Sequence, residues 1–213
     1  GSHEVSDYLD VIVSPADLPE FAAELLSYLH THITGWETLN LYNLLDSSPS
    51  IPAFESAAAD AGWHTDLSTL QPSPYIALPG DWETYLAGID KKQRHEIRRK
   101  MRRAENAEQP AKWYVLSDPE NLEQDIDSFL DLMAQGSEKA VFLSEAMVPY
   151  MRQVMRTAFK EGYLHLSFLE IGGEKAAAKL CFDYQNRLWG YNSGFNNEFL
   201  SYSPGWVLMG HLL

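Results

Sequence analysis

Apolar and polar residues alternate along the last fifty residues, which is the spacing of half-buried strands. Apolar side chains take every second position over 164–168, and Gly172-Gly173 then supplies a tight turn. Similar patterns over 176–184 and 187–195 flank a second turn at Gln185-Asn186. The pattern predicts an antiparallel meander of three strands.

A helix is predicted soon after this meander. Ser203 is a residue type favoured at a helix N-cap, and Pro204 is favoured at the first helical position. The helix should continue to Leu213. Because the first amides of a helix are unpaired and attract anions, residues 203–206 form either a phosphate seat or an ordinary strand-to-helix turn.

Helical and strand periodicities also recur in the rest of the chain. Apolar residues spaced by three and four predict helices over 17–33, 53–61, 82–107 with a break near Gly88, 118–135 and 144–161. Residues 5–13 alternate loosely and are rich in Val, Ile and Tyr, which predicts a strand, and further strands are predicted over 37–45, 63–70, 75–78 and 112–116. This mixture indicates an α+β fold, with two halves before and after about residue 108.

Charge is distributed very unevenly. The net charge of -14 argues against general affinity for nucleic acid or anionic lipid, yet residues 91–103 hold eight of the sixteen Lys and Arg residues. Arg94, Arg98 and Arg102 fall in one row at helical spacing. This basic helix is a solvated face paired with acids, a docking surface for an acidic or phosphorylated acceptor, or an RNA contact.

Cysteine and histidine usage narrows the class of protein. The lone Cys181 excludes a disulfide framework and fits a chain made in a reducing, cytoplasmic compartment. The scattered histidines do not resemble metal ligands, so no metal is predicted. We expect no membrane span or signal peptide, and we expect residues 1–3 to be an expression scar.

Several motifs together resemble the GNAT-type acyltransferases, and more closely their CelD-like and FemAB-like branch. They occupy residues 5–10, 74–79 with Trp82, 92–99, 177–180, 191–195 and 202–205. The resemblance implies a GNAT-like mixed sheet flanked by helices, in two tandem halves. Residues 1–108 would form a partial first half ending in the basic helix, and 109–213 a partial half that binds acyl-CoA. By this comparison the chain is a fragment lacking both ends.

The resemblance also implies where the donor lies. Acyl-CoA, most simply acetyl-CoA, would lie in a cleft beside the strand 187–195, with its pyrophosphate near the following helix. The implied donor-binding residues are Asn192, Ser193, Gly194, Phe195, Ser203, Gly205 and Trp206. Of the family's usual glycine-rich pyrophosphate loop, only Gly205 is present.

The chemistry implied is direct attack of an acceptor amine or hydroxyl on the thioester carbonyl. Such a reaction needs positioning, an oxyanion donor and a base, but no protein nucleophile, so Cys181 is interpreted as a packing residue. We predict Asp183 as the base and Tyr191 as an acid or acceptor-positioning group. A solvated carboxylate and a packed aromatic ring are the alternatives for these two residues.

The sequence thus predicts a cytoplasmic acyltransferase that modifies a cell-envelope or exopolysaccharide precursor. The acceptor would be a small molecule or saccharide, and Arg94, Arg98 and Arg102 would bind it. Two alternatives stay open. One is a FemAB-like transferase that uses aminoacyl-tRNA as donor, and the other is a non-catalytic scaffold that docks partners on the basic helix.

Overall fold

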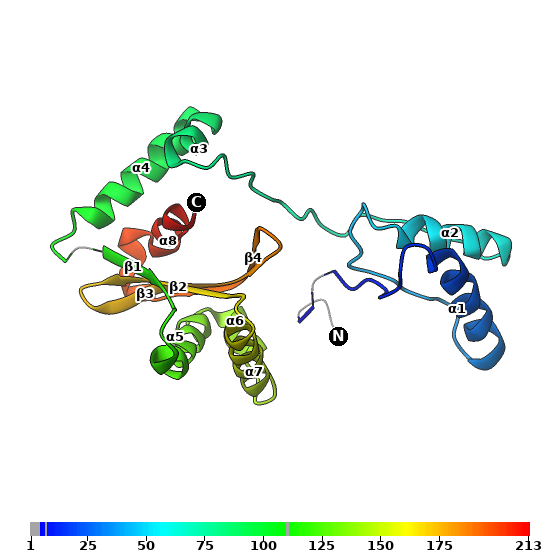
Figure 1. The fold of residues 1–213 in the computed structure, drawn as a ribbon. Helices are drawn as coiled ribbons and strands as arrows, with labels where there is room; N and C mark the ends of the chain where they lie inside the picture. Colours follow the sequence, from blue (N-terminus) through cyan, green and yellow to red (C-terminus); the bar gives the residue numbers. More distant parts are fainter. Residues whose placement is uncertain (1–4, 7, 110) are drawn as a thin grey trace. The chain divides into compact units, whose positions relative to one another are not determined.

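The computed structural model describes residues 5–6, 8–109 and 111–213 (Figure 1). Residues 1–3, and Asp7 within the first motif and first predicted strand, lie outside the described residues. The chain forms two compact units that part between Tyr75 and Ile76. The basic helix therefore belongs to the same unit as the sheet. The organisation into two GNAT-like halves that meet near residue 108 stays a prediction.

The second unit is built on one sheet of four strands in the order β1-β2-β3-β4, antiparallel throughout. The strands are β1 (Ala111–Val115), β2 (Leu164–Ile171), β3 (Glu174–Tyr184) and β4 (Arg187–Phe195). Its helices are α3 (Trp82–Gly88), α4 (Lys91–Glu105), η1 (Pro119–Asn121), α5 (Leu122–Ala134), α6 (Ser137–Phe142), α7 (Met147–Lys160), η2 (Asn197–Tyr202) and α8 (Pro204–Leu212). The predicted meander, α+β class and final helix are confirmed.

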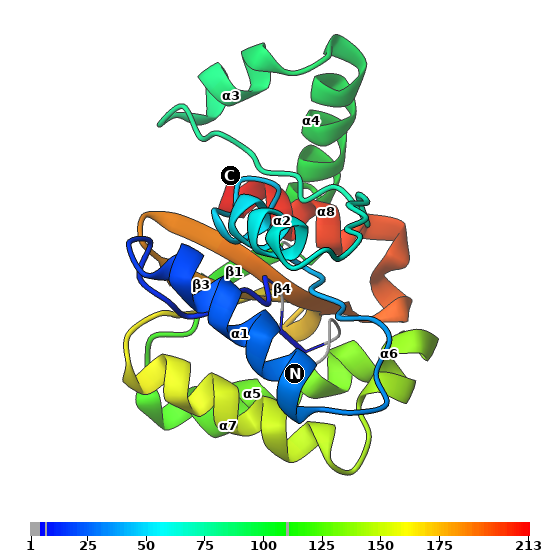
Figure 2. The ribbon, with the colours of Figure 1, turned by 90° about the vertical axis from the view of Figure 1, so that its right-hand side faces the viewer.

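Helices cover both faces of this sheet. Helices α5 and α7 lie against one face and α8 against the other, with α4 packed on α8 (Figures 1 and 2). Period-two alternation explains this division, since successive strand residues point to opposite faces. Leu180 and Phe168 are buried with α5 and α7, whereas Ala177 and Leu169 are buried with α8 and with Ala104 of α4.

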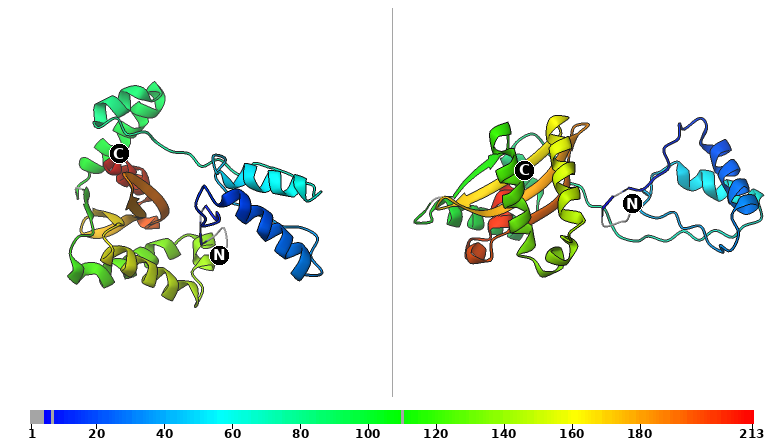
Figure 3. Two further views of the ribbon diagram at one scale, coloured as in Figure 1. Left: turned by 45° about the vertical axis from the view of Figure 1, so that its right-hand side comes forward. Right: turned by 90° about the horizontal axis from the view of Figure 1, so that it is seen from below.

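The first unit contains α1 (Leu18–His32) and α2 (Ser50–Asp60), which pack against each other (Figure 3). Both were predicted from their periodicity. Asp10 holds the start of α2, because its carboxylate accepts hydrogen bonds from the hydroxyls of Ser48 and Ser50, the latter at 2.6 Å. This side-chain contact orders the chain before α1 without a strand.

Four of the predicted strands are wrong. The described residues of 5–13, 37–45, 63–70 and 75–78 contain no strand. A strand requires a hydrogen-bonded neighbour, and alternation within a segment carries no information about that partner. Several apolar side chains of these segments consequently lie in solvent, as with Leu67 and with Tyr75, which is 90% exposed, whereas Val11 and Trp63 pack against α1 and α2.

The backbone of α5 approaches β4 very closely at Gly194. A Cβ atom at this glycine would lie 2.4 Å from both the carbonyl carbon of Leu132 and the amide nitrogen of Met133. No side chain fits at that distance. At Gly194, which the resemblance implies as a donor-binding residue, the approaching group is a helix of the protein's own core.

A buried carboxylate ties the sheet to α5. Asp125 is 3% exposed, and its Oδ1 accepts hydrogen bonds from the Tyr114 hydroxyl at 3.0 Å and from Lys175 Nζ at 2.5 Å. The Lys175 ammonium also donates to Ser128 Oγ at 3.0 Å. Burial and the neighbouring charge of Asp125 raise the pKa of Tyr114.

Replacing Gly194 by alanine should destabilise the second unit by about 3 kcal/mol, because the new methyl group overlaps the α5 backbone. Urea unfolding measures the change. Gly88→Ala is the control, since a Cβ at Gly88 meets no atom within 4 Å. Its effect should stay within about 1 kcal/mol. Equal effects of the two substitutions would contradict the close approach.

Stability should fall at alkaline pH partly through Tyr114. Because its folded pKa is raised, its contribution is complete below the unfolded value of about 10 and is lost as the pH rises through the folded value. The Tyr114→Phe variant should therefore lose less stability than wild type when urea unfolding is compared at about pH 9 and pH 11. Tyr150→Phe, which makes the same change at an exposed tyrosine, is the matched control.

Candidate functional site

A β-bulge interrupts the edge strand β4. Leu180 of β3 pairs with Asn192, but Cys181 pairs with Gly190, so Tyr191 is an extra residue in β4. Bulges bend a strand and are common at sheet edges and beside active sites. The bulge lies in the strand that leads through η2 into α8.

The start of α8 offers fewer open amides than the sequence indicated. Ser203 is the N-cap and adopts a left-handed conformation with φ of 56°, and its side chain makes no capping bond. Its carbonyl accepts hydrogen bonds from the amides of Trp206 at 3.0 Å and Val207 at 3.1 Å, while its own amide donates to Leu200. In the described part of the chain, only the Gly205 amide of residues 203–206 has no acceptor.

The open space at Gly205 is real. A Cβ there would meet no heavy atom within 4 Å, and Gly205 and Trp206 are both exposed. Phe195, at the end of β4, is 40% exposed. Lys100 of α4 lies over the Trp206 ring at 4.4 Å. The Gly205 amide, next to the exposed Trp206, is what remains of the predicted phosphate seat.

Side chains of the protein occupy the edge of β4 at Ser193. The Ser193 amide donates to Asn192 Oδ1 at 2.8 Å, and its carbonyl accepts from Lys139 Nζ. A ligand that pairs with this backbone must first displace those side chains. The residue pattern gives no sign of a role for Lys139, because α6 has six residues and is too short to show a helical period.

The two predicted catalytic residues are not brought together. Asp183 is exposed and, by strand alternation, points to the face opposite Phe182. Tyr191 packs on the Phe182 side, with the two rings edge to face at 5.7 Å between centroids. The carboxylate and the phenol therefore flank the sheet rather than meet in one cavity, and their roles stay predictions.

Comparison with known families now bears on this arrangement. The model of the family described as an acetyltransferase (GNAT) domain matches residues 91–213, from the first residue of α4 to the end of the chain. The chain belongs to this GNAT acetyltransferase family. General acyl transfer is thereby assigned to residues 91–213. No curated protein matches the chain.

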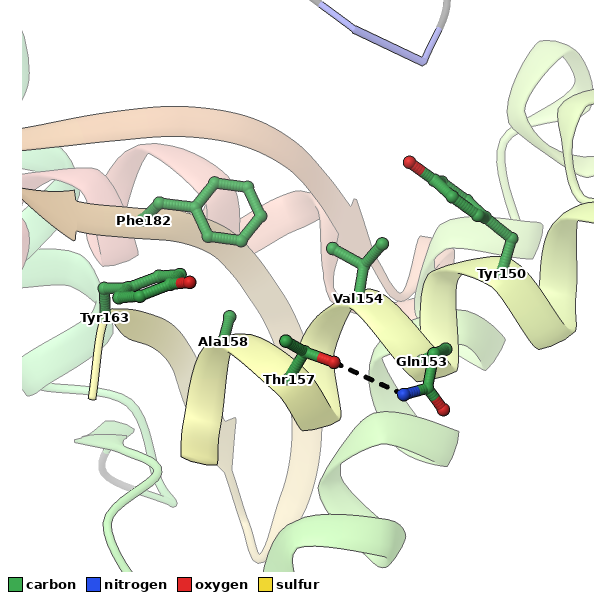
Figure 4. A pocket seen from close by; sticks show the side chains of 7 residues that line it. All are labelled: Tyr150, Gln153, Val154, Thr157, Ala158, Tyr163 and Phe182. Atoms are coloured by element: carbon green, nitrogen blue, oxygen red, sulfur yellow. Dashed lines mark hydrogen bonds between the residues drawn. The ribbon is translucent and has the colours of Figure 1, made fainter. Parts of the chain in front are cut away.

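The GNAT domain has a shallow hollow between α7 and the end of β3 (Figure 4), with a volume of about 260 Å³. It is lined by Tyr150, Gln153, Val154, Thr157, Ala158, Tyr163 and Phe182. Phe182, which lines the hollow, also contacts the ring of Tyr191 at the bulge of β4. Sequence reasoning missed it, because its walls come from an outer helix face and a strand end that only the fold brings together.

The basic helix α4 is partly neutralised. Asp90 caps its first turn, Arg98 pairs with Glu83 at 2.5 Å, and Arg99 pairs with Glu96 at 2.7 Å. The hydrogen bond from Arg99 lowers the pKa of Glu96 to about 2. Among the described residues, the α4 cations without an ion pair are Lys91, Lys92, Arg94, Arg102 and Arg103. Acidic side chains therefore neutralise only some of the cations of α4, and the five just named keep an uncompensated charge with respect to the described residues.

Cys181 lies inside the sheet and is 1% exposed. Burial raises the pKa of its thiol, which disfavours the nucleophilic thiolate. None of the helices in the described ranges combines the length and apolar character that crossing a bilayer requires.

Proposed function

We propose that this GNAT domain transfers an acetyl group from acetyl-CoA to an amine or hydroxyl of a cell-envelope or exopolysaccharide precursor in the cytoplasm. Membership of the family supports acyl transfer. The observation that carries the donor assignment is the course of β4, a bulged edge strand that leads into α8 and its open Gly205 amide. An edge strand and a helix N-terminus suit an extended, phosphate-bearing ligand.

The donor would be held by residues of β4 and α8. Bound acetyl-CoA supplies a thioester carbonyl that an acceptor amine or hydroxyl can attack. The Gly205 amide would donate to a phosphate oxygen, and Ser203 and Trp206 would flank it. Residues Asn192, Ser193 and Phe195 would lie along the donor, with Gly194 setting the position of β4 from beneath.

Asp183 and Tyr191 are proposed to act from opposite faces of the sheet. Both residues can serve one reaction only if the reacting carbonyl lies at the outer edge of β4, which is reachable from either face. Tyr191 would position the acceptor or donate a proton to the leaving thiolate, and Asp183 would take the proton of the attacking group. The hollow beside Phe182 is the proposed seat for a small part of the acceptor.

The basic helix is proposed to bind the acidic part of the acceptor. Arg94 is half-buried and Arg102 is exposed, and neither pairs with a carboxylate in the described part of the chain. Arg98 can exchange its exposed partner Glu83 for a ligand, because surface ion pairs contribute little. A sugar nucleotide or lipid-linked saccharide carries the phosphate charge that such a surface attracts.

A scaffold without turnover is the second candidate. It is favoured by the hydrogen bonds that already occupy the Trp206 and Val207 amides and the Ser193 backbone. The alternative donor, aminoacyl-tRNA, is favoured by the unpaired cations of α4, since phosphate contacts dominate RNA affinity. Competition between charged tRNA and acetyl-CoA separates these alternatives.

Acetyl-CoA should bind the 213-residue chain in calorimetry, and Gly205→Leu should weaken binding about tenfold or more, because a large side chain covers the open amide. Gly205→Ala is the matched control and should change the affinity less than about threefold. Circular dichroism checks that both variants fold. Wild-type chain that binds no acetyl-CoA would favour the scaffold.

Changing Arg94, Arg98 and Arg102 together to glutamine should reduce acetylation of a nucleotide-linked amino sugar, with a loss that shrinks as salt rises. Acetylation of the free amino sugar should change little, since it carries no phosphate. A triple glutamine variant at Lys112, Lys160 and Arg187 matches the charge change away from α4. Equal losses of activity in the two triple variants would show that α4 is a solvated face that does not bind the acceptor.

A further inference from the structure

Two lysines near β4, Lys139 and Lys179, have no acidic partner among the residues that the structure describes. Lys139 comes from α6 and Lys179 from β3, and neither forms an ion pair with any described residue. The chain carries thirty Asp and Glu residues against sixteen Lys and Arg, so acidic partners are plentiful. Both lysines are half-buried. Lys139 and Lys179 are thus unpaired among the described residues even though the chain has an excess of acidic side chains.

Lys139 is directed onto Ser193. Its ammonium donates to the Ser193 carbonyl and lies 3.3 Å from Ser193 Oγ. Burial, together with the positive charge of Lys179, lowers the pKa of Lys139. These contacts satisfy part of the ammonium's hydrogen-bonding capacity but supply no negative charge.

Lys179 approaches the same strand from β3. Its Cα pairs with Ser193 on one side and with Ser167 on the other, so the three side chains share one face of the sheet. The ammonium lies 3.4 Å from the position that a Cβ of Gly190 would occupy. Gly190 thus leaves room for the lysine head group beside β4.

The other half-buried lysine of β3, in contrast, is paired with an acidic residue. Lys175 has a carboxylate from Asp125 at 2.5 Å and a hydroxyl from Ser128 at 3.0 Å. Lys139 and Lys179 instead repel each other, which is unfavourable in a partly desolvated place unless an anion joins them.

We infer that Lys139 and Lys179, with the Ser193 hydroxyl beside them, form a binding site for a phosphate group. Two ammonium groups match a phosphate of charge about -2, and lysine binds phosphate as a point charge. The phosphate belongs either to the acyl donor or to a phosphorylated acceptor. The choice between those sources rests on the proposed function, whereas the site itself does not.

The proposed site would compensate for the small number of free hydrogen-bond donors at the start of α8. The open Gly205 amide alone would hold a phosphate weakly, and the glycine-rich loop of the family is represented by Gly205 only. Lysine charge from α6 and β3 would take over the part that backbone amides play elsewhere. Anion binding there also draws Lys139 from the Ser193 carbonyl and opens that part of the edge.

Calorimetry with three probes tests the site in the wild-type chain and in Lys139→Gln and Lys179→Gln. The probes are acetyl-CoA, acetyl-pantetheine, which has the thioester arm without phosphates, and glucosamine 6-phosphate compared with glucosamine. Loss of one charged contact should weaken the phosphate-bearing ligand about tenfold in each variant. Acetyl-pantetheine and glucosamine should bind the variants and wild type alike.

Lys112→Gln is the control, since it removes an exposed lysine of β1, and Lys139→Arg should restore binding by restoring the charge.

A loss of affinity confined to acetyl-CoA identifies the acyl donor as the source of the phosphate, and a loss confined to glucosamine 6-phosphate identifies the acceptor as its source. If wild-type chain binds neither, the proposed function fails, and an NMR titration with inorganic phosphate still decides the site. Amide shifts at Ser193 and Lys179 that vanish in both glutamine variants support it. Unchanged phosphate affinity in both variants, or no such shifts, overturns it.

Discussion

The contact between the α5 backbone and Gly194 fixes the edge of the sheet on which the candidate site depends. With no side chain at Gly194, the helix lies directly on β4 and holds it in place. The end of α5 also holds the segment that leaves β4, because Gln135 Oε1 accepts a hydrogen bond from the Asn197 amide at 3.0 Å. After two intervening residues, α6 begins, and its Lys139 donates a hydrogen bond to Ser193. One close approach thus sets the edge strand, its exit and its nearest cation.

The two faces of the sheet are stabilised differently. The face against α5 forms the main apolar core, and the face against α8 carries polar residues next to β4. The α5 side closes around large apolar side chains and the buried Asp125 pair. On the α8 side, the cover reaches Leu169 and Ala177, and polar residues such as Ser167 and Lys179 follow toward β4. The Ser167 hydroxyl is satisfied, because it donates a hydrogen bond to the Lys179 carbonyl. The Lys179 ammonium, in contrast, has no acidic partner among the described residues, and the proposed phosphate would supply one.

Sequence patterns predicted those parts of the fold that depend on local periodicity. The meander and the long helices are confirmed because alternation and three-to-four spacing report directly on burial of one face. The four absent strands fail for the opposite reason, since segments such as 5–13 and 75–78 contain residue types typical of strands, Ile12 and Tyr75 among them, but have no neighbouring strand in the described ranges. The bulge at Tyr191 and the left-handed Ser203 depend on register and backbone conformation, which residue types alone do not determine.

The candidate site was harder to predict than the fold because its parts come from distant segments. A single open amide at Gly205 is weak evidence for a phosphate seat, yet the family match makes a phosphate-bearing donor the expected ligand. These two facts agree only if other groups supply the charge. In the described residues around Ser193, Lys139 and Lys179 are the cations without an acidic partner, and they approach β4 from an adjoining helix and the adjacent strand. The proposed phosphate site would account both for the single open amide at Gly205 and for the two lysines near β4.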